Sequence, residues 1–170
     1  MEYNKKKYKE IALNIIKEHD SKIEYNLAKV SDFVKIGEWI KENINYNRTY
    51  HGRQDISALE IYNNRAGVCH HITVLYNALL YSLGYQCIYV CGFAVNNNDN
   101  NYFSEDNSHA WSLIKVNDKW LPLDATWGIF SGKLPVTHFF EYYFSSNQHT
   151  SGTDYIKFGE TKVKGHIYGI

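Results

Sequence analysis

One cysteine, one histidine and one aspartate of this chain have the residue types that nucleophilic catalysis on a carbonyl requires. Cys69 follows an Ala-Gly-Val segment, His109 begins the segment His-Ala-Trp, and Asp124 lies fifteen positions after that histidine. A thiol attacks as the thiolate, so it needs a base that takes its proton. An imidazole supplies that base, and a carboxylate fixes its tautomer and stabilises its positive charge. Cys69, His109 and Asp124 are therefore candidates for nucleophile, base and orienting carboxylate.

The residues after Cys69 predict the helix that would carry this nucleophile. Apolar side chains recur at spacings of three and four and form one helical face, at Ile72, Leu75, Leu79 and Leu83. Gly84 is a typical residue after the end of a helix. Cys69 then lies in the first turn, where backbone N–H groups have no partner within the helix and the helix dipole favours a negative charge.

Strands are predicted to position the other two candidates. Segments 86–95, 109–116 and 119–127 are rich in β-branched and aromatic residues. The polar segment 96–108 is expected to be a loop, either a plain solvated one or a flexible flap over the site. The apolar block 139–144 follows, and the tail after it could add a strand or two.

The turn between the second and third predicted strands decides whether histidine and aspartate can meet. If Asn117 and Asp118 are the two loop residues of a hairpin, His109 lies opposite Thr126, and Asp124 is a diagonal neighbour on the same face. A three-residue loop would place the two side chains on opposite faces. The candidate site therefore requires the two-residue turn or a compensating bulge.

Helices are predicted to precede this sheet. Apolar periodicity indicates helices over 3–18 and 33–44, and Ser57 with Glu60 forms a capping-box pattern before a short helix. Residues 45–56 are polar and turn-like. Helices followed by antiparallel strands predict an α+β fold, and the length predicts one domain over 1–170 with a helical part at 1–45.

Composition argues against several classes of protein. The 170 residues carry 18 basic and 18 acidic side chains, so bulk charge does not predict a nucleic-acid partner. No apolar run approaches the roughly 20 residues of a membrane span, and the N-terminus lacks the apolar region of a signal peptide. Three cysteines argue against a disulfide framework. We therefore expect a cytoplasmic protein, or one delivered without a recognisable signal peptide.

Two long motifs resemble the transglutaminase-like superfamily: AGVCHHITVLYNALLYSLGYQCIYVCGFA and SHAWSLIKVNDKWLPLDATWG. The clear resemblance covers residues 65–128 and extends loosely over 40–147. It implies a papain-like fold in which the core helix packs on an antiparallel sheet. It also implies catalytic residues at Cys69, His109 and Asp124. Activities of this family include cysteine peptidase, protein transglutaminase, protein deamidase and peptide N-glycanase chemistry.

This resemblance implies a function that needs no cofactor. We expect a cysteine-nucleophile amide hydrolase, a peptidase or amidase, that acts on a protein or peptide through a thioacyl-enzyme. The alternative is a protein transglutaminase or glutamine deamidase, in which the acyl group passes to an amine or to water. A non-catalytic binding module on the same fold is the hypothesis from another class.

Further residues are candidates for contacts with the substrate. Trp111, Trp127 and His70 are candidate substrate-binding residues, although the two tryptophans could instead pack the sheet. The side chain of the oxyanion hole is not readable from the motif. Tyr46 and Gln54 are candidates for it, together with Tyr50 and the backbone N–H of Cys69.

The cysteines and histidines could also have structural roles instead of catalytic ones. Cys69 could be a small core residue or a ligand in a Cys–His–Asp zinc site, but no CxxC or HExxH spacing accompanies it, so we expect no metal. His70 and His71 would diverge by about 100° on a helix and could not easily chelate together. Cys87 and Cys91, four apart on a strand, would have Cα atoms about 13 Å apart, too far for a disulfide. We interpret both as core residues.

Overall fold

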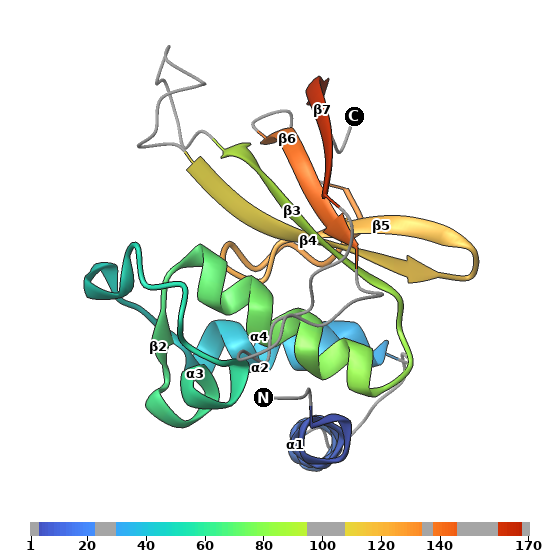
Figure 1. Cartoon of the computed structure of the whole chain (residues 1–170). Coiled ribbons are helices and arrows are strands. Elements are labelled where there is room, and N and C mark those ends of the chain that lie inside the picture. Colours follow the sequence, from blue (N-terminus) through green and yellow to red (C-terminus); the bar gives the residue numbers. More distant parts are fainter. Residues whose placement is uncertain (1–3, 23–29, 95–107, 134–137, 146–159, 168–170) are drawn as a thin grey trace.

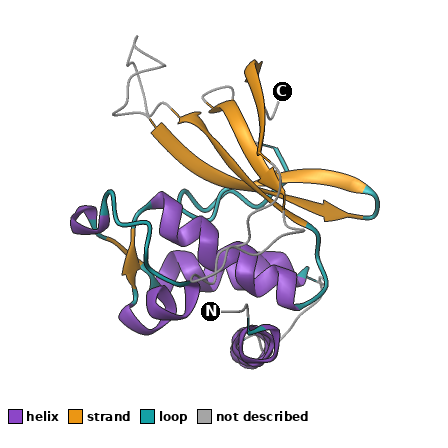
Figure 2. Cartoon of the chain, in the orientation of Figure 1, coloured by secondary structure: helices purple, strands orange, loops and turns teal. Residues whose placement is uncertain are grey.

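A layer of helices packs against one face of an antiparallel sheet (Figures 1 and 2). The computed structural model describes residues 4–22, 30–94, 108–133, 138–145 and 160–167. The elements are α1 (Lys5–Ser21), α2 (Asp32–Asn43), β1 (Asn45–Tyr46), the 3-10 turn η1 (Arg48–Tyr50), α3 (Ala58–Asn64), β2 (Ala66–Gly67), α4 (Cys69–Ser82), β3 (Cys87–Ala94), β4 (Ser108–Val116), β5 (Lys119–Leu123), β6 (His138–Ser145) and β7 (Glu160–Ile167). The predicted α+β class is confirmed. The predicted loop 96–108 lies, apart from its last residue, outside the described residues.

Helix α4 is the centre of the core. It packs against α1, α2 and α3 and against β3 and β4 of the sheet. All side chains from His71 to Leu80 are buried, so the helix is covered on nearly all sides rather than on the single face that its periodicity predicted. The helix ends as predicted, because Gly84 follows it with a φ of +98°.

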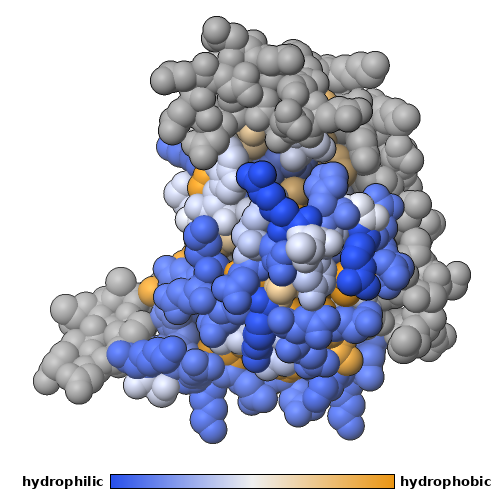
Figure 3. All heavy atoms as spheres, turned by 90° about the vertical axis from the view of Figure 1, so that its left-hand side faces the viewer, coloured by the Kyte–Doolittle hydropathy of each residue, from blue (hydrophilic) through white to orange (hydrophobic). Residues whose placement is uncertain are grey.

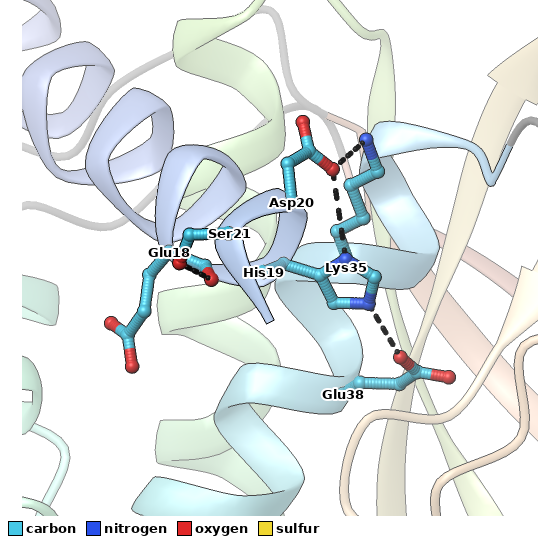
Figure 4. A network of polar contacts seen from close by, with 6 residues as sticks. All are labelled: Glu18, His19, Asp20, Ser21, Lys35 and Glu38. Carbon is cyan, nitrogen blue, oxygen red and sulfur yellow. Dashed lines mark hydrogen bonds and ion pairs between the residues drawn. The ribbon is translucent and has the colours of Figure 1, made fainter. Parts of the chain in front are cut away.

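Polar contacts join α1 to α2 beside this core (Figure 4). The buried Lys35 ammonium lies 2.6 Å from Asp20, and His19 Nε2 lies 3.1 Å from Glu38. The hydrogen bond from Lys35 lowers the pKa of Asp20, since it favours the ionised carboxylate. Tyr8, on the buried face of α1, joins this helix to α3, because its hydroxyl accepts a hydrogen bond from the Leu59 N–H at 3.0 Å. These contacts fix α1 over two other helices.

The strands of the main sheet lie in the order β5-β4-β3-β6-β7, and each neighbouring pair is antiparallel. Val116 pairs with Lys119, and Asn117 and Asp118 between them have φ values of 50° and 62°. This is the predicted two-residue turn, whose mirror-image geometry matches the twist of the strands. The third strand was predicted to reach residue 127, which is wrong: β5 ends at Leu123, because the chain then turns back on itself.

The segment predicted as turns, 45–56, contains a short strand. In β1, Asn45 pairs with Ala66 and Tyr46 with Gly67 of β2, in parallel. The sequence has no strand signal there, because the strand is only two residues long and its partner lies 21 positions further along the chain. The capping box of α3 is confirmed: the Glu60 N–H donates to Ser57 Oγ, and the Ser57 N–H donates to the Glu60 carboxylate. Across the described ranges, no helix has the length and apolar character needed to cross a membrane.

Candidate active site

Cys69 is the first residue of α4, as predicted, and its thiol lies among groups that favour negative charge. Sγ accepts hydrogen bonds from the backbone N–H groups of His70 and Ala110 and is hydrogen-bonded to His109. Burial opposes ionisation of the thiol, but these hydrogen bonds and the charge of His109 outweigh it and lower the pKa of Cys69. The surroundings of Cys69 thus favour the thiolate.

The early end of β5 makes room for the thiol at the edge of β4. The ladder between the two strands runs from Val116–Lys119 to Ser112–Leu123, so residues 108–111 of β4 have no partner in β5. The Ala110 N–H is therefore available to the sulfur. A buried hydrogen bond of 2.7 Å from Ser112 Oγ to Asn77 Oδ1 ties β4 to the middle of α4 and fixes this approach.

His109 and Asp124 meet as the predicted register requires. His109 Nε2 lies 2.7 Å from Asp124 Oδ2, and the carboxylate has no solvent exposure. Burial favours the neutral imidazole, but the hydrogen bonds and charges of Asp124 and Cys69 raise the pKa of His109 to about 9. Since Asp124 holds Nε2, the other ring nitrogen, Nδ1, is left for the thiol.

A closed turn holds the Asp124 carboxylate in place. Backbone hydrogen bonds of 2.9 Å join Asp124 and Ile129 in both directions, and the Trp127 N–H donates to Asp124 Oδ1 at 3.0 Å. Gly128 has a φ of +73°, which favours glycine at this position. Lys41 of α2 donates to the Thr126 carbonyl at 3.0 Å. The Asp-Ala-Thr-Trp-Gly motif is therefore a turn that presents a carboxylate, not the end of a strand.

Two tryptophans flank the His109 ring. Trp111 stacks at 5.9 Å between centroids and Trp127 lies at 5.0 Å. Trp111 is fully buried and packs with Ile88, so of the two interpretations of this residue the structure favours packing in the sheet, and its role in substrate binding stays a prediction. It belongs, with Val90 and Leu113, to a buried cluster that is separate from the core around α4. Trp127 is half-buried beside the site.

Tyr46 is the oxyanion candidate that lies at the thiol. Its hydroxyl accepts a hydrogen bond from the Cys69 N–H and is also hydrogen-bonded to the Cys69 thiol. Burial and the neighbouring thiol raise the pKa of Tyr46, so the phenol keeps its proton. Gln54 lies on an exposed segment and, within the described residues, makes no hydrogen bond to Cys69. Tyr50 packs edge-on against the ring of His71, 5.7 Å away.

The two histidines after Cys69 do different things. His70 Nδ1 lies 2.7 Å from the Tyr89 hydroxyl of β3, and burial, with the nearby His71, lowers the pKa of His70 to about 4. His71 Nδ1 accepts the N–H of Val68 at 3.1 Å, and its Nε2 donates to the Arg53 carbonyl. His71 is therefore held neutral. The N-cap residue of α4 is Val68, whose side chain cannot form hydrogen bonds. His71 therefore supplies the side-chain hydrogen bond at the start of this helix.

His71 and Tyr89 were not among the predicted site residues. A signal for His71 exists in Gly67, where an added Cβ would lie 2.5 Å from the Cβ of His71. Only glycine leaves room for His71 at this distance. The glycine two residues before Cys69 therefore indicates that a side chain packs against the strand that precedes the nucleophile. Tyr89 has no such signal, because only the pairing of β3 with β4 brings it to α4.

The other two cysteines lie in β3. Cys87 is fully buried, and burial raises its pKa far above the ordinary value. Its predicted place in the core is confirmed. Cys91 is half-buried, pairs with Ala110 in the sheet, and is not in a disulfide. In the described part of the chain, no group of three or more histidine, cysteine or acidic side chains could hold a metal ion.

The geometry can support a definite chemistry. A thiol at a helix N-terminus, an imidazole beside it and a buried carboxylate behind the imidazole form one hydrogen-bonded chain. Such a chain can move a proton from sulfur to nitrogen and leave a nucleophile beside backbone donors.

Comparisons with known proteins identify the family of this chain. Residues 5–125 match the model of the transglutaminase-like superfamily. Among solved structures, a candidate cysteine protease from Cytophaga hutchinsonii is 26% identical, with a TM-score of 0.53 over 72% of this chain and 38% of that one. The fold also matches that of a transglutaminase (TGase) at 14% identity, with a TM-score of 0.50 over 75% of this chain and 34% of that one.

This chain thus corresponds to little more than a third of the length of either solved protein. The curated proteins contain no match to it. The family model, however, covers well over half of the sequence and includes all three residues of the hydrogen-bonded chain. The chain therefore belongs to the transglutaminase-like superfamily.

Proposed function

We propose that this protein is a cysteine-nucleophile amide hydrolase, a peptidase or amidase that acts on a protein or peptide. One observation carries the proposal: the thiol of Cys69, the His109 ring and the buried Asp124 carboxylate are joined by hydrogen bonds, with 2.7 Å between ring and carboxylate. A binding module would have no physical reason to bury an ionisable carboxylate behind a histidine, since burial of a charge costs free energy.

In the first half of the reaction, Cys69 is the nucleophile. The proton of the thiol passes to His109, and the thiolate attacks the carbonyl carbon of the amide. The resulting oxyanion lies near the Cys69 N–H, and the Tyr46 hydroxyl turns to donate a second hydrogen bond to it. The imidazolium then gives its proton to the leaving nitrogen, the C–N bond breaks, and a thioacyl-enzyme remains.

In the second half, water takes the place of the departed amine. His109 removes a proton from the water, which attacks the thioester carbonyl, and the C–S bond breaks to release a carboxylic acid. Asp124 stays ionised throughout and orients the ring. Trp127, beside the ring and half-buried, and His70, at the same helix N-terminus, are candidate contacts for the substrate.

The alternative is acyl transfer to an amine, or deamidation of a glutamine side chain, through the same thioacyl-enzyme. The likeness to a candidate cysteine protease at 26% identity favours hydrolysis, whereas the likeness to a transglutaminase at 14% supports the fold alone. A casein digest with and without a primary amine distinguishes them. Hydrolysis yields new peptide termini, and transfer yields peptides that carry the amine.

Selective alkylation tests the nucleophile itself. Iodoacetamide should label Cys69 at mildly acidic pH, while Cys87 stays unlabelled because its thiol is buried and its pKa is raised. Cys69→Ala should abolish both labelling and hydrolysis, and Cys87→Ala is the matched control. If Cys69 were no more reactive than Cys91, the proposed nucleophile would be wrong.

A further inference from the structure

Strand β1 has an unpaired edge directly beside the candidate nucleophile. The N–H groups of Asn45 and Asn47 donate to the carbonyls of Arg65 and Gly67, at 2.8 and 2.9 Å. Alternate residues of a strand direct their main-chain groups to opposite sides, so the N–H and C=O of Tyr46 point away from β2. Within the described residues, neither group has a main-chain partner.

This edge is open to solvent. Both residues of β1 are exposed, and Tyr46 keeps 53% of its surface accessible. Figure 3 turns to the viewer the side of the molecule on which β2 lies, and the described residues of that side are mainly hydrophilic. Main-chain hydrogen bonds are therefore the contacts that this edge offers.

The edge and the nucleophile belong to one rigid unit. Tyr46 pairs with Gly67, which precedes Cys69 by two residues, or about 7 Å of extended chain. The same Tyr46 reaches Cys69 with its side chain, since its hydroxyl is hydrogen-bonded to the Cys69 N–H and thiol. One residue thus has its main chain at the open edge and its hydroxyl where the oxyanion would form.

We propose that the main chain of an extended peptide substrate adds to the Tyr46 edge as a third strand of the β1–β2 ribbon. The N–H and C=O of Tyr46 exchange hydrogen bonds with one substrate residue, and this strand addition leads the next residues to Cys69. The inference rests on the proposed function, because it assigns the part of the substrate that the candidate hydrolase holds. It selects extended chains, so helical or tightly folded segments are excluded as substrates.

A peptide probe with a scanned backbone tests this strand addition. Acetyl-tetraalanyl vinyl sulfone, which a thiolate alkylates by addition, is compared with methyl vinyl sulfone and with four analogues that each carry one N-methyl group. The peptide should alkylate Cys69 faster than the small reagent. One analogue should react about 3- to 12-fold more slowly than the parent, as the loss of one net hydrogen bond predicts. Equal rates for all four analogues would overturn the proposal.

A pair of variants tests the protein side of the same contact. Tyr46→Pro and Tyr46→Ala both lose the hydroxyl, but only the proline lacks the N–H, and proline is tolerated where an edge N–H faces solvent. The peptide probe should react about 3- to 12-fold more slowly with the proline variant than with the alanine variant. Iodoacetamide should not distinguish them.

The iodoacetamide rate separates this inference from the proposed function. If the two variants react equally with the peptide probe while iodoacetamide still labels Cys69 selectively, the edge is not used and the nucleophile stands. Loss of selective labelling in the unmodified protein would overturn both. Circular dichroism of the two variants establishes that each is folded before the rates are compared.

Discussion

Asp124→Asn should shift the proton of the neutral His109 ring from Nε2 to Nδ1, the nitrogen that must accept the proton of the thiol. Oδ1 of Asp124 accepts the Trp127 N–H, and Oδ2 accepts the proton of His109 Nε2. An asparagine must keep its oxygen toward Trp127, so its NH₂ group faces Nε2. That nitrogen must then accept a hydrogen bond, and the ring proton moves to Nδ1, the side of the thiol. Such a ring cannot take the proton of Cys69.

The size of the effect follows from the pKa of His109. A rise from 6.5 to about 9 corresponds to about 3 kcal/mol of preference for the imidazolium, shared between Asp124 and Cys69. If the carboxylate supplies half or more of it, the variant loses about 1.5–3 kcal/mol, or about 10- to 100-fold in the population of the thiolate–imidazolium pair. His109 is only 7% exposed, so solvent screens little of this interaction.

The assay is the rate at which iodoacetamide alkylates Cys69, measured by intact mass from about pH 5 to about pH 10. In the unmodified protein, reactivity should persist below the ordinary pKa of a thiol, and in Asp124→Asn the profile should move to higher pH. Asp118→Asn is the matched control, because Asp118 lies in the hairpin turn with a φ of 62°, which asparagine tolerates. An unchanged profile in Asp124→Asn would refute the role assigned to the carboxylate.

Three further predictions concern stability. The folded pKa of His109, about 9, exceeds the ordinary 6.5, so its contribution is complete below about pH 6.5 and is lost as the pH rises through about 9. His109→Gln should therefore cost more in urea unfolding at about pH 6 than at about pH 10, and equal costs would contradict this. Gly67→Ala should destabilise by about 1–3 kcal/mol because the added Cβ would lie 2.5 Å from the Cβ of His71, and His71→Ala, which keeps that Cβ, should not restore the loss in a double-mutant cycle measured by urea unfolding. Ser57→Ala, which removes the cap of α3, should cost about 1 kcal/mol by thermal unfolding while the alkylation rate stays the same.

Local patterns predicted the parts of the fold that short-range physics determines. Helix α4 begins at Cys69 because the apolar spacing starts there, and α3 is capped by groups three residues apart. The register of the hairpin follows from a two-residue turn, and that register places His109 and Asp124 on one face. In each case the interacting groups are close in sequence or joined by one short turn.

Long-range packing determined what the patterns missed. The burial of Trp111 depends on which face of the sheet the helices cover, and a strand pattern does not state this. The end of β5 at Leu123 depends on the turn that α2 holds through Lys41. That early end exposes the Ala110 N–H to the thiol, so one unpredicted feature supplies part of the surroundings of the nucleophile.

The sequence by itself determined which groups can take part in catalysis. They are a cysteine at the start of a helix, and a histidine and an aspartate in register across a hairpin. Those are consequences of hydrogen bonds and side-chain periodicity within about twenty residues. Only the tertiary structure decided that Tyr46, rather than Gln54, lies at the thiol and that its main chain forms an open edge. The pairing of β1 with β2 selects it, and this pairing joins segments whose own side chains carry no signal for each other.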